Sequence, residues 1–293
     1  MPATRVKEAP LTVASIQMEP LIGAVEHNLQ RSIALIEEAA AKGAKLVVLP
    51  ELCNTGYVFE SRTEAQALAE AIPDGPSSQA WIAAARRLDV HIVAGITERD
   101  GLLLYNAAVI IGPDGLIGRY RKVHLWGDEA LYFAPGNLGF PVFDTPFGRI
   151  GCHICYDCWF PESFRLAALQ GAEIVCVPTN WVPIPGQDPK REAMANIIVM
   201  GAAHSNSVFV VCADRVGTER GQPFIGQSLI VGQTGWPVAG PASADREEIL
   251  IATVNLADAR RKRNWNDFNQ VMRDRRRDVY DEMLGSGLKP GWY

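Results

Sequence analysis

The chain has 293 residues, of which 48% are hydrophobic and 21% are charged, and its formal net charge is -5. A chain of this size can bury a large core and is near the upper size of one domain, so we expect a single domain over residues 1–293. The negative net charge disfavours nucleic acid as a partner. Residues 1–10 lack the apolar stretch of a signal peptide. No apolar run reaches the ~20 residues that span a bilayer, so we expect no membrane partner and a cytoplasmic location.

The cysteines agree with that location. There are six of them, namely Cys53, Cys152, Cys155, Cys158, Cys176 and Cys212. In a chain of this length they do not resemble the disulfide framework of a small secreted domain. We therefore expect free thiols in a reducing compartment.

The first half of the chain predicts strands that alternate with helices and then pair as hairpins. Short apolar or β-rich runs predict strands at 11–17, 46–49, 91–96 and 105–111. A helical pattern ends near Gly43, and a second helix is predicted over 78–88. Turn signals at 100–101 and 113–115 flank the last of these strands, which predicts hairpins and hence a mixed sheet.

The second half continues the alternation. Strands are predicted at 117–121, 150–154, 174–177, 209–212, 228–231 and 249–254. Helices are predicted over 162–170 and from an N-cap at Asp188 followed by Pro189. Alternating strands and helices with hairpins among them predict a layered α/β architecture, in which helices cover buried sheets.

Candidate reactive groups stand directly beyond predicted strands. In layered α/β folds such groups collect there, because a side chain can leave the core and still be held rigidly. Glu51, Lys122 and Cys155 each follow or end a predicted strand. Asn180 and Trp181 emerge in the same way from a later one. If these ends converge, a carboxylate, an ammonium and a thiol share one pocket.

The chemistry of that trio is specific. A free cysteine is only a few per cent thiolate at neutral pH, so Cys155 needs a base or a cationic neighbour. A carboxylate whose pKa is raised by burial is a competent base, and Glu51 fits this role. The ammonium of Lys122 and the backbone N–H of Tyr156 are suitable donors to an oxyanion. The sequence therefore predicts acyl transfer through a thioester on Cys155, which water then hydrolyses.

Three segments carry a family resemblance. They are Leu49-Pro50-Glu51, Tyr120 to Leu125, and Gly151 to Glu162 with Cys155-Tyr156-Asp157 at its centre. In this order they resemble the motifs of the nitrilase (carbon–nitrogen hydrolase) superfamily. The resemblance extends over nearly the whole chain, including Asp214 to Glu219 and Phe224 to Ser228, and an extended match is more specific than any one short motif.

The resemblance has implications for the site and the fold. It implies a catalytic triad of Glu51, Lys122 and Cys155, with Glu129 as a second glutamate that orients it. It also implies a four-layer α-β-β-α sandwich and no cofactor. The family assembles through a sandwich-to-sandwich homodimer, often into larger homo-oligomers, and we expect the charged tail over about 256–293 to lie in such contacts.

Departures from the family pattern narrow the range of expected substrates. Nitrile-specific branches place Trp-Glu after the nucleophile, whereas Tyr156-Asp157 is similar to the amidase and carbamoylase branches. We therefore expect hydrolysis of a small-molecule amide or carbamoyl amine with release of ammonia, and nitrile hydrolysis is the alternative. Cys158-Trp159 stand where hydrolases of N-carbamoyl amino acids carry an arginine pair, which disfavours an anionic substrate. Asp214 replaces the more usual asparagine.

The aromatic residues near these motifs leave two interpretations open. Tyr57, Trp126 and Trp181 either line the acyl pocket together with Asn180 or belong to the core, where large aromatics are more often found. Asp157 is expected to be a structural hydrogen-bond partner of the turn rather than a catalyst.

A metal or iron–sulfur site is an alternative of another class. Cys152, Cys155 and Cys158 have the spacing of metal ligands. Strand alternation is expected to place Cys152 and Cys155 on opposite faces, and no fourth ligand completes a set. A binding protein that keeps the fold without catalysis is a further possibility, but nothing in the sequence favours it over an enzyme.

Overall fold

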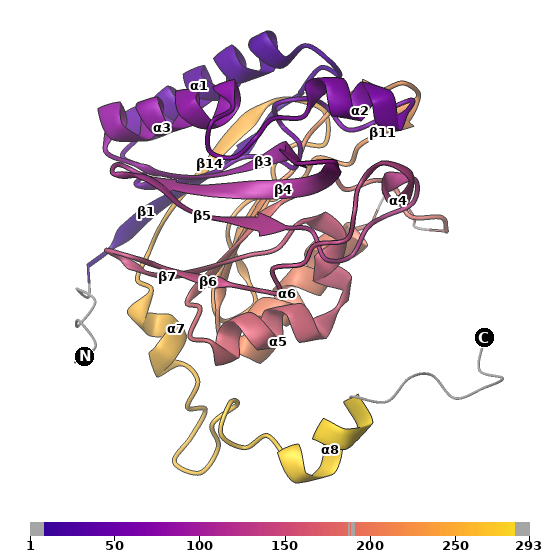
Figure 1. The fold of residues 1–293 in the computed structure, drawn as a ribbon. Helices are drawn as coiled ribbons and strands as arrows, with labels where there is room; N and C mark the ends of the chain where they lie inside the picture. Colours follow the sequence, from indigo (N-terminus) through magenta and orange to yellow (C-terminus); the bar gives the residue numbers. More distant parts are fainter. Residues whose placement is uncertain (1–8, 187, 189–190, 285–293) are drawn as a thin grey trace, which may run out of the picture.

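The computed structural model describes residues 9–186, 188 and 191–284. Two six-stranded sheets lie face to face, and helices cover the outer face of each (Figure 1). The expected four-layer α-β-β-α sandwich is therefore confirmed. No helix within the described ranges is long and apolar enough to cross a membrane.

The first sheet is mixed, as the hairpin signals predicted. In sheet order its strands are β14 (Glu248–Val254), β1 (Leu11–Gln17), β2 (Leu46–Val48), β3 (His91–Asp100), β4 (Leu103–Gly112) and β5 (Gly115–Arg121). The strands β1, β2 and β3 run parallel, whereas the β3–β4 and β4–β5 pairs are antiparallel hairpins. The helices α1 (Val25–Ala41) and α3 (Pro76–Leu88) cover the outer face with buried side chains such as Ile36 and Trp81.

The second sheet has a similar plan. In sheet order its strands are β13 (Pro237–Ala239), β12 (Leu229–Val231), β9 (Phe209–Ala213), β8 (Ile174–Pro178), β7 (Gly148–Cys152) and β6 (Val142–Thr145). The central strands β7, β8 and β9 are parallel. The helices α5 (Pro161–Leu169) and α6 (Met194–Asn206) lie on its outer face, with Phe164 and Val199 fully buried.

Period-two alternation divides the side chains of β1 between two cores. Val13 joins the core between the two sheets, whereas Ala14 and Ile16 join the core beneath α1 and α3. The Ser15 hydroxyl faces the second sheet and donates to the carbonyl of Cys212 at 2.6 Å. The two sheets are thus joined by apolar packing and by a buried hydrogen bond, which fixes their strand ends relative to each other.

Several short elements complete the described chain. They are α2 (Arg62–Leu68), α4 (Glu129–Tyr132), the 3-10 helix η1 (Cys155–Trp159), β10 (Thr218–Glu219), β11 (Gln222–Pro223), α7 (Ala257–Arg261) and α8 (Arg277–Leu284). The predicted helix start at Asp188 is wrong, because the backbone is still extended at Ala193 and α6 begins at Met194. Pro189 lies outside the described residues. The helix α8 stands apart from the sandwich in Figure 1.

Candidate active site

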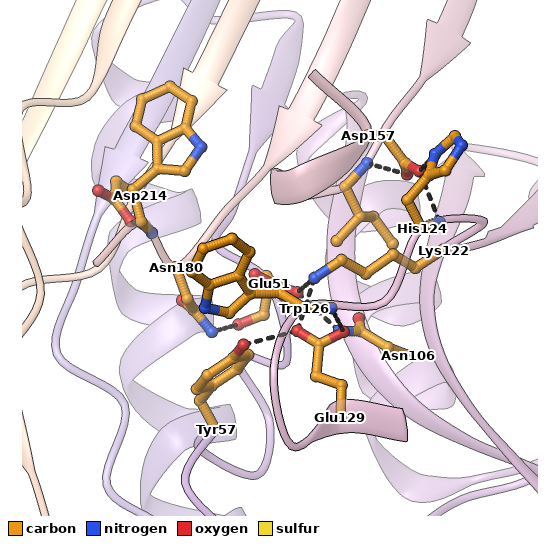
Figure 2. Close-up of polar contacts among 12 residues, drawn as sticks. Glu51, Tyr57, Asn106, Lys122, His124, Trp126, Glu129, Asp157, Asn180 and Asp214 are labelled. Carbon is orange, nitrogen blue, oxygen red and sulfur yellow. Dashed lines mark hydrogen bonds and ion pairs between the residues drawn. The ribbon is translucent and has the colours of Figure 1, made fainter. Parts of the chain in front are cut away.

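The ends of four strands meet at one edge of the sandwich. Glu51 follows β2 and Lys122 follows β5 in the first sheet, while Cys155 and Asn180 follow β7 and β8 in the second. Figure 2 shows Glu51, Lys122 and Asn180 pointing toward a common centre. The backbone of Glu51 approaches β3 so closely that a Cβ on Gly95 would lie 2.5 Å from the Cα of Glu51. A glycine at this position of β3 therefore lets the carboxylate segment pack into the site.

Lys122 lies between two carboxylates. Its Nζ donates to Oε1 of Glu51 at 2.7 Å and to Oε1 of Glu129 at 2.6 Å. The side chains of Lys122 and Glu51 are fully buried, and that of Glu129 is 4% exposed. A single ammonium thus faces two carboxylates away from solvent, where charge interactions are much stronger than at the surface.

Side-chain and backbone groups donate further hydrogen bonds to the carboxylates of Glu51 and Glu129 (Figure 2). Asn106 Nδ2 donates to Oε1 of Glu51 at 2.6 Å, and the hydroxyl of Tyr57 donates to Oε1 of Glu129 at 2.6 Å. The backbone N–H of Trp126 donates to Oε2 of Glu129 at 3.3 Å. Oε2 of Glu51 has no partner among the described residues. Glu51 is therefore fixed through one oxygen, while its other oxygen is free to accept a proton.

The environment of Glu51 raises its pKa to about 7. Burial is the main cause, the attraction of Lys122 opposes it, and the negative charge of Glu129 adds to it. A carboxylate with a pKa near the operating pH combines a substantial ionised fraction with adequate basicity. Glu51 is thus tuned for proton transfer near neutral pH.

Lys122 remains an ammonium in this setting. Burial acts to lower its pKa, but the carboxylates of Glu129 and Glu51 outweigh that effect and raise the pKa well above its usual range. The second glutamate thus has a physical consequence, because a single buried carboxylate would compensate the lysine less fully.

Cys155 lies at the start of η1 and is 6% exposed. Burial raises the pKa of its thiol, the negative charge of Glu51 raises it further, and Lys122 acts in the opposite direction. The resting side chain is therefore a thiol, and a base must take its proton when it reacts. Its φ of 47° lies in the left-handed region, which is uncommon for a residue other than glycine and recurs at functional sites.

Asp157 connects the cysteine turn to the lysine segment. Its carboxylate accepts the backbone N–H of Ile154 at 3.0 Å, the backbone N–H of His124 at 3.0 Å and the hydroxyl of Tyr120 at 2.7 Å. Tyr120 and His124 flank Lys122 in the sequence, so this buried carboxylate clamps the Lys122 segment to the turn that carries Cys155. Asp157 is a structural residue of the turn, as expected.

Two adjoining cavities open on these residues. A cavity of about 20 Å³ is lined by Trp126, Cys155, Tyr156, Trp159, Asn180, Trp181, Val182 and Ile184. A neighbouring cavity of about 240 Å³ shares Trp126 and Val182 with it and is also lined by Tyr57 and Glu129. The structure thus places Trp126, Asn180 and Trp181 beside the thiol, whereas Tyr57 lines the second cavity. The backbone of Tyr156 follows the thiol directly.

Two polar residues of the site escaped the sequence analysis. Asn106 binds Glu51 from the middle of β4, and the Thr179 hydroxyl acts to lower the pKa of Cys155. An asparagine inside an otherwise apolar strand was a visible signal for Asn106, because a buried amide needs partners. Thr179 gave no comparable signal, since threonine is common at strand ends.

The predicted geometry of the cysteine cluster is wrong in one respect. The strand β7 ends at Cys152 rather than continuing to Ile154, because the N–H of Ile154 is bound by Asp157 and Cys155 already begins η1. Strand alternation therefore does not relate Cys152 to Cys155. All six cysteines are buried free thiols. Within the described ranges, no group of three or more His, Cys, Asp or Glu side chains is arranged to hold a metal ion.

Comparisons with known proteins agree with this architecture. The family model for carbon–nitrogen hydrolases matches residues 12–264. A nitrilase of Pyrococcus abyssi (strain GE5 / Orsay) is 45% identical over 92% of this chain and 98% of its own length. An N-carbamoylputrescine amidase of Solanum lycopersicum is 35% identical over 94% of this chain and 95% of its own length. The crystal structure of a carbon–nitrogen hydrolase from Helicobacter pylori G27 superimposes with a TM-score of 0.85 at 30% identity, over 95% of this chain and 99% of the other.

The fold, the strand-end site and these matches define a hydrolase of carbon–nitrogen bonds. The chain belongs to the carbon–nitrogen hydrolase family, that is, to the nitrilase superfamily. The resemblance seen in the sequence is thereby confirmed, including its similarity to amidase and carbamoylase members.

Proposed function

We propose that this protein hydrolyses the C–N bond of a small-molecule amide or carbamoyl amine through a thioester on Cys155. Glu51 is the base, Lys122 is the cationic partner, and ammonia is released. The observation that carries this proposal is the buried Glu51, which binds Lys122 through one oxygen, keeps the other unpartnered and acts electrostatically on the Cys155 thiol.

The first half-reaction forms the thioester. Oε2 of Glu51 takes the thiol proton as Sγ of Cys155 attacks the carbonyl carbon, and the carbonyl oxygen becomes an oxyanion. The Lys122 ammonium and the backbone N–H of Tyr156 donate to that oxyanion. Glu51 then returns the proton to the nitrogen as the C–N bond breaks, so ammonia leaves and the acyl group stays on sulfur.

The second half-reaction reverses these roles. Ionised Glu51 takes a proton from a water molecule, whose oxygen attacks the thioester carbonyl. The second tetrahedral intermediate uses the same two donors. Its collapse breaks the C–S bond and releases the acid, and the proton held by Glu51 restores the Cys155 thiol. Glu129 contributes by holding Lys122 in place and in its charged form.

The orientation of Asn180 supports an amide over a nitrile. Its Nδ2 donates to the carbonyl oxygen of Glu51 at 2.9 Å, which determines which end of the amide is the oxygen. The resulting Oδ1 is buried, has no partner among the described residues and belongs to a side chain that lines the Cys155 cavity. An amide or carbamoyl NH2 group can donate to it, whereas a nitrile has no N–H. A nitrile remains the alternative substrate, because one relative is named a nitrilase.

The walls of the cavities support a neutral or cationic substrate. None of the described residues that line either cavity is lysine, arginine or histidine, and the exposed carboxylate of Asp128 lies at the rim of the larger one. Lys122 is already paired with two carboxylates. A substrate carboxylate would therefore lack a charged partner and would face repulsion.

The test is a panel of neutral aliphatic and aromatic amides, carbamoyl amines, N-carbamoyl amino acids and nitriles, assayed for ammonia release. We expect turnover of amides or carbamoyl amines, weaker turnover of the anionic compounds, and none with Cys155→Ala. Intact-mass measurement during turnover should show an acyl adduct on the wild-type protein. Full turnover by the alanine variant, or turnover of nitriles alone, would contradict the proposal.

We also propose that the protein works as a homodimer or larger homo-oligomer in the cytoplasm. Apolar side chains that are nearly half exposed cover the outer helices α5 and α6, namely Leu166, Leu169, Met194 and Ile197. The tail over 256–293 adds exposed Trp265 and Phe268, while residues 285–293 lie outside the described part. Six free thiols suit a reducing compartment.

A further inference from the structure

Glu219 lies outside the strand ends that carry the site, in the short strand β10. Its side chain is 4% exposed and pairs with Arg215, which is 2% exposed, at 2.8 Å. Arg215 also donates to the carbonyl of Pro20 at 2.9 Å, and its guanidinium lies 4.1 Å from the ring centroid of Phe224. Glu219 is therefore held in one position by a buried and well-partnered arginine.

The other oxygen of Glu219 anchors the loop that carries Tyr57. Oε2 accepts the backbone N–H of Tyr57 at 2.7 Å and that of Val58 at 2.6 Å. Gly56, just before them, has a φ of 85°, and a Cβ there would lie 2.8 Å from Oε1 of Glu219. Phe224 contacts the Tyr57 ring edge-on at a centroid distance of 5.9 Å. The loop thus rests directly on the glutamate carboxylate.

Tyr57 connects the anchored loop to the ammonium of Lys122 through Glu129. The Tyr57 hydroxyl donates to Oε1 of Glu129 at 2.6 Å, and the same oxygen receives Nζ of Lys122 at 2.6 Å. Both bonds to Oε1 require Tyr57 and Lys122 to approach it from different directions. The position of the Tyr57 backbone therefore helps to determine where Glu129 holds Lys122.

A buried ion pair is weak support for stability, because desolvation offsets most of its attraction. A packed apolar pair could fill the same volume, but it could not accept two backbone N–H groups. We propose that Glu219, held by Arg215, is a positioning residue for the reaction, and that it acts through Tyr57 on the Glu129–Lys122 pair. This inference rests on the proposed function for its catalytic consequence.

The test is a double-mutant cycle of Glu219→Gln and Tyr57→Phe. The glutamine has one acceptor oxygen instead of two, so it cannot bind Arg215 and the two backbone N–H groups at the same time. We expect each single variant to lower kcat by about tenfold or more, the effect of losing a hydrogen bond to a charged group. The double variant should be no slower than Tyr57→Phe alone. KM should change less than kcat, because the affected bond is made to Glu129 and not to substrate.

A second measurement reads the same cycle without any substrate. Cys155 is alkylated with iodoacetamide across a range of pH, and the rate is followed by intact mass with Cys155→Ala as the blank. The two single variants should slow alkylation and shift its pH profile alike, again without a further change in the double variant. This cycle decides the inference even if no amide in the panel is hydrolysed, so failure of the proposed function remains distinguishable.

The matched control is Glu70→Gln. Glu70 is also buried and accepts a backbone N–H, that of Ser77 at 2.8 Å, but it binds none of the residues around Lys122. We expect it to lower the melting temperature without changing kcat or the alkylation profile at a temperature well below unfolding. The inference is overturned if the effects of Glu219→Gln and Tyr57→Phe multiply, or if Glu70→Gln reproduces the kinetic change.

Discussion

At the scale of single residues, two opposed influences adjust the reactive groups. Burial pushes the pKa of Glu51 upward and Lys122 pulls it down, with a net rise to about 7. Burial and the charge of Glu51 keep Cys155 protonated at rest. Proton transfer from sulfur to Glu51 would therefore accompany attack on the substrate, so no thiolate is present at rest to undergo side reactions.

The first prediction is that kcat/KM depends on pH through the ionisation of Glu51. In the proposed mechanism Glu51 is the base, so its protonation below its pKa should remove activity, and kcat/KM should fall as pH drops through about 7. Above that value Glu51 is ionised, and the profile should level off. Glu51→Gln should abolish turnover at all pH values while keeping the fold. An acid limb centred near pH 4.5, the ordinary value for a glutamate, would show that the buried carboxylate is not the base.

The second prediction concerns discrimination by Asn180. Asn180→Leu keeps the approximate shape and removes Oδ1, so the site loses the acceptor that we propose for a substrate N–H. We expect the ratio of kcat/KM for an amide to that for the methyl ester of the same acid to fall about tenfold, since the ester has no N–H to lose.

Asn106→Leu is the matched control for Asn180. Asn106 binds Glu51 and lines neither described cavity, so this variant should slow the amide and the ester equally. An unchanged ratio for Asn180→Leu, or an equal change of the ratio in both variants, would contradict the assigned role of Oδ1.

At the scale of elements, the sequence predicted those that local pattern determines. The apolar run that begins at Leu46 gave β2, and the turn at 100–101 gave the β3–β4 hairpin. The end of β7 depends instead on Asp157, which binds an N–H three residues upstream and gives rise to η1. Likewise, the partner of Asn106 is Glu51, which lies 55 residues earlier in the chain. Tertiary contacts of this kind leave no periodic signal. For this reason the strands themselves were predicted, but the exact end of β7 and the residues that hydrogen-bond Glu51 were not.

The third prediction concerns the clamp between β5 and η1. Asp157→Ala would remove the acceptor of two buried donors, the Tyr120 hydroxyl and the Ile154 N–H, at about 1–3 kcal/mol each, and also the part-buried contacts with His124. The free energy of unfolding should therefore fall by about 3 kcal/mol or more. Tyr120→Phe removes one of these bonds and should cost about 1 kcal/mol. Urea unfolding of each variant and of the wild type measures both changes in the free energy of unfolding.

Measuring kcat of the same two variants distinguishes a clamp that positions the site from a contact that only stabilises the fold. Tyr120→Phe leaves both backbone bonds to Asp157 in place, so kcat should change little at a temperature far below unfolding. Asp157→Ala should lower kcat strongly at the same temperature, because the Lys122 segment and the Cys155 turn lose their link. Full activity of a folded Asp157→Ala protein would show that other contacts hold the two segments together.

At the scale of the whole molecule, the sandwich places one half of the site on each sheet. Glu51 and Lys122 come from the first sheet, Cys155 and Asn180 come from the second, and the core between the sheets sets their separation. The outer surfaces of the sandwich still expose apolar side chains. The sheets are covered by helices, yet α5 and α6 still present apolar side chains that are nearly half exposed, and these are the side chains that the proposed assembly would cover.

The fourth prediction tests whether a second copy of the chain covers that surface. Leu169 on α5 and Ile197 on α6 are 44% and 46% exposed, so a charge at either position is tolerated in a monomer but would be buried unpaired in an interface. Sedimentation equilibrium should give a dimer or larger species for the wild type, and a monomer for Leu169→Arg combined with Ile197→Arg, with unchanged circular dichroism. Leu102→Arg is the control, because Leu102 is 86% exposed on the β3–β4 turn, and the mass should remain that of the wild type. A wild-type monomer would refute the assembly, and an intact oligomer of the double variant would move the interface away from α5 and α6.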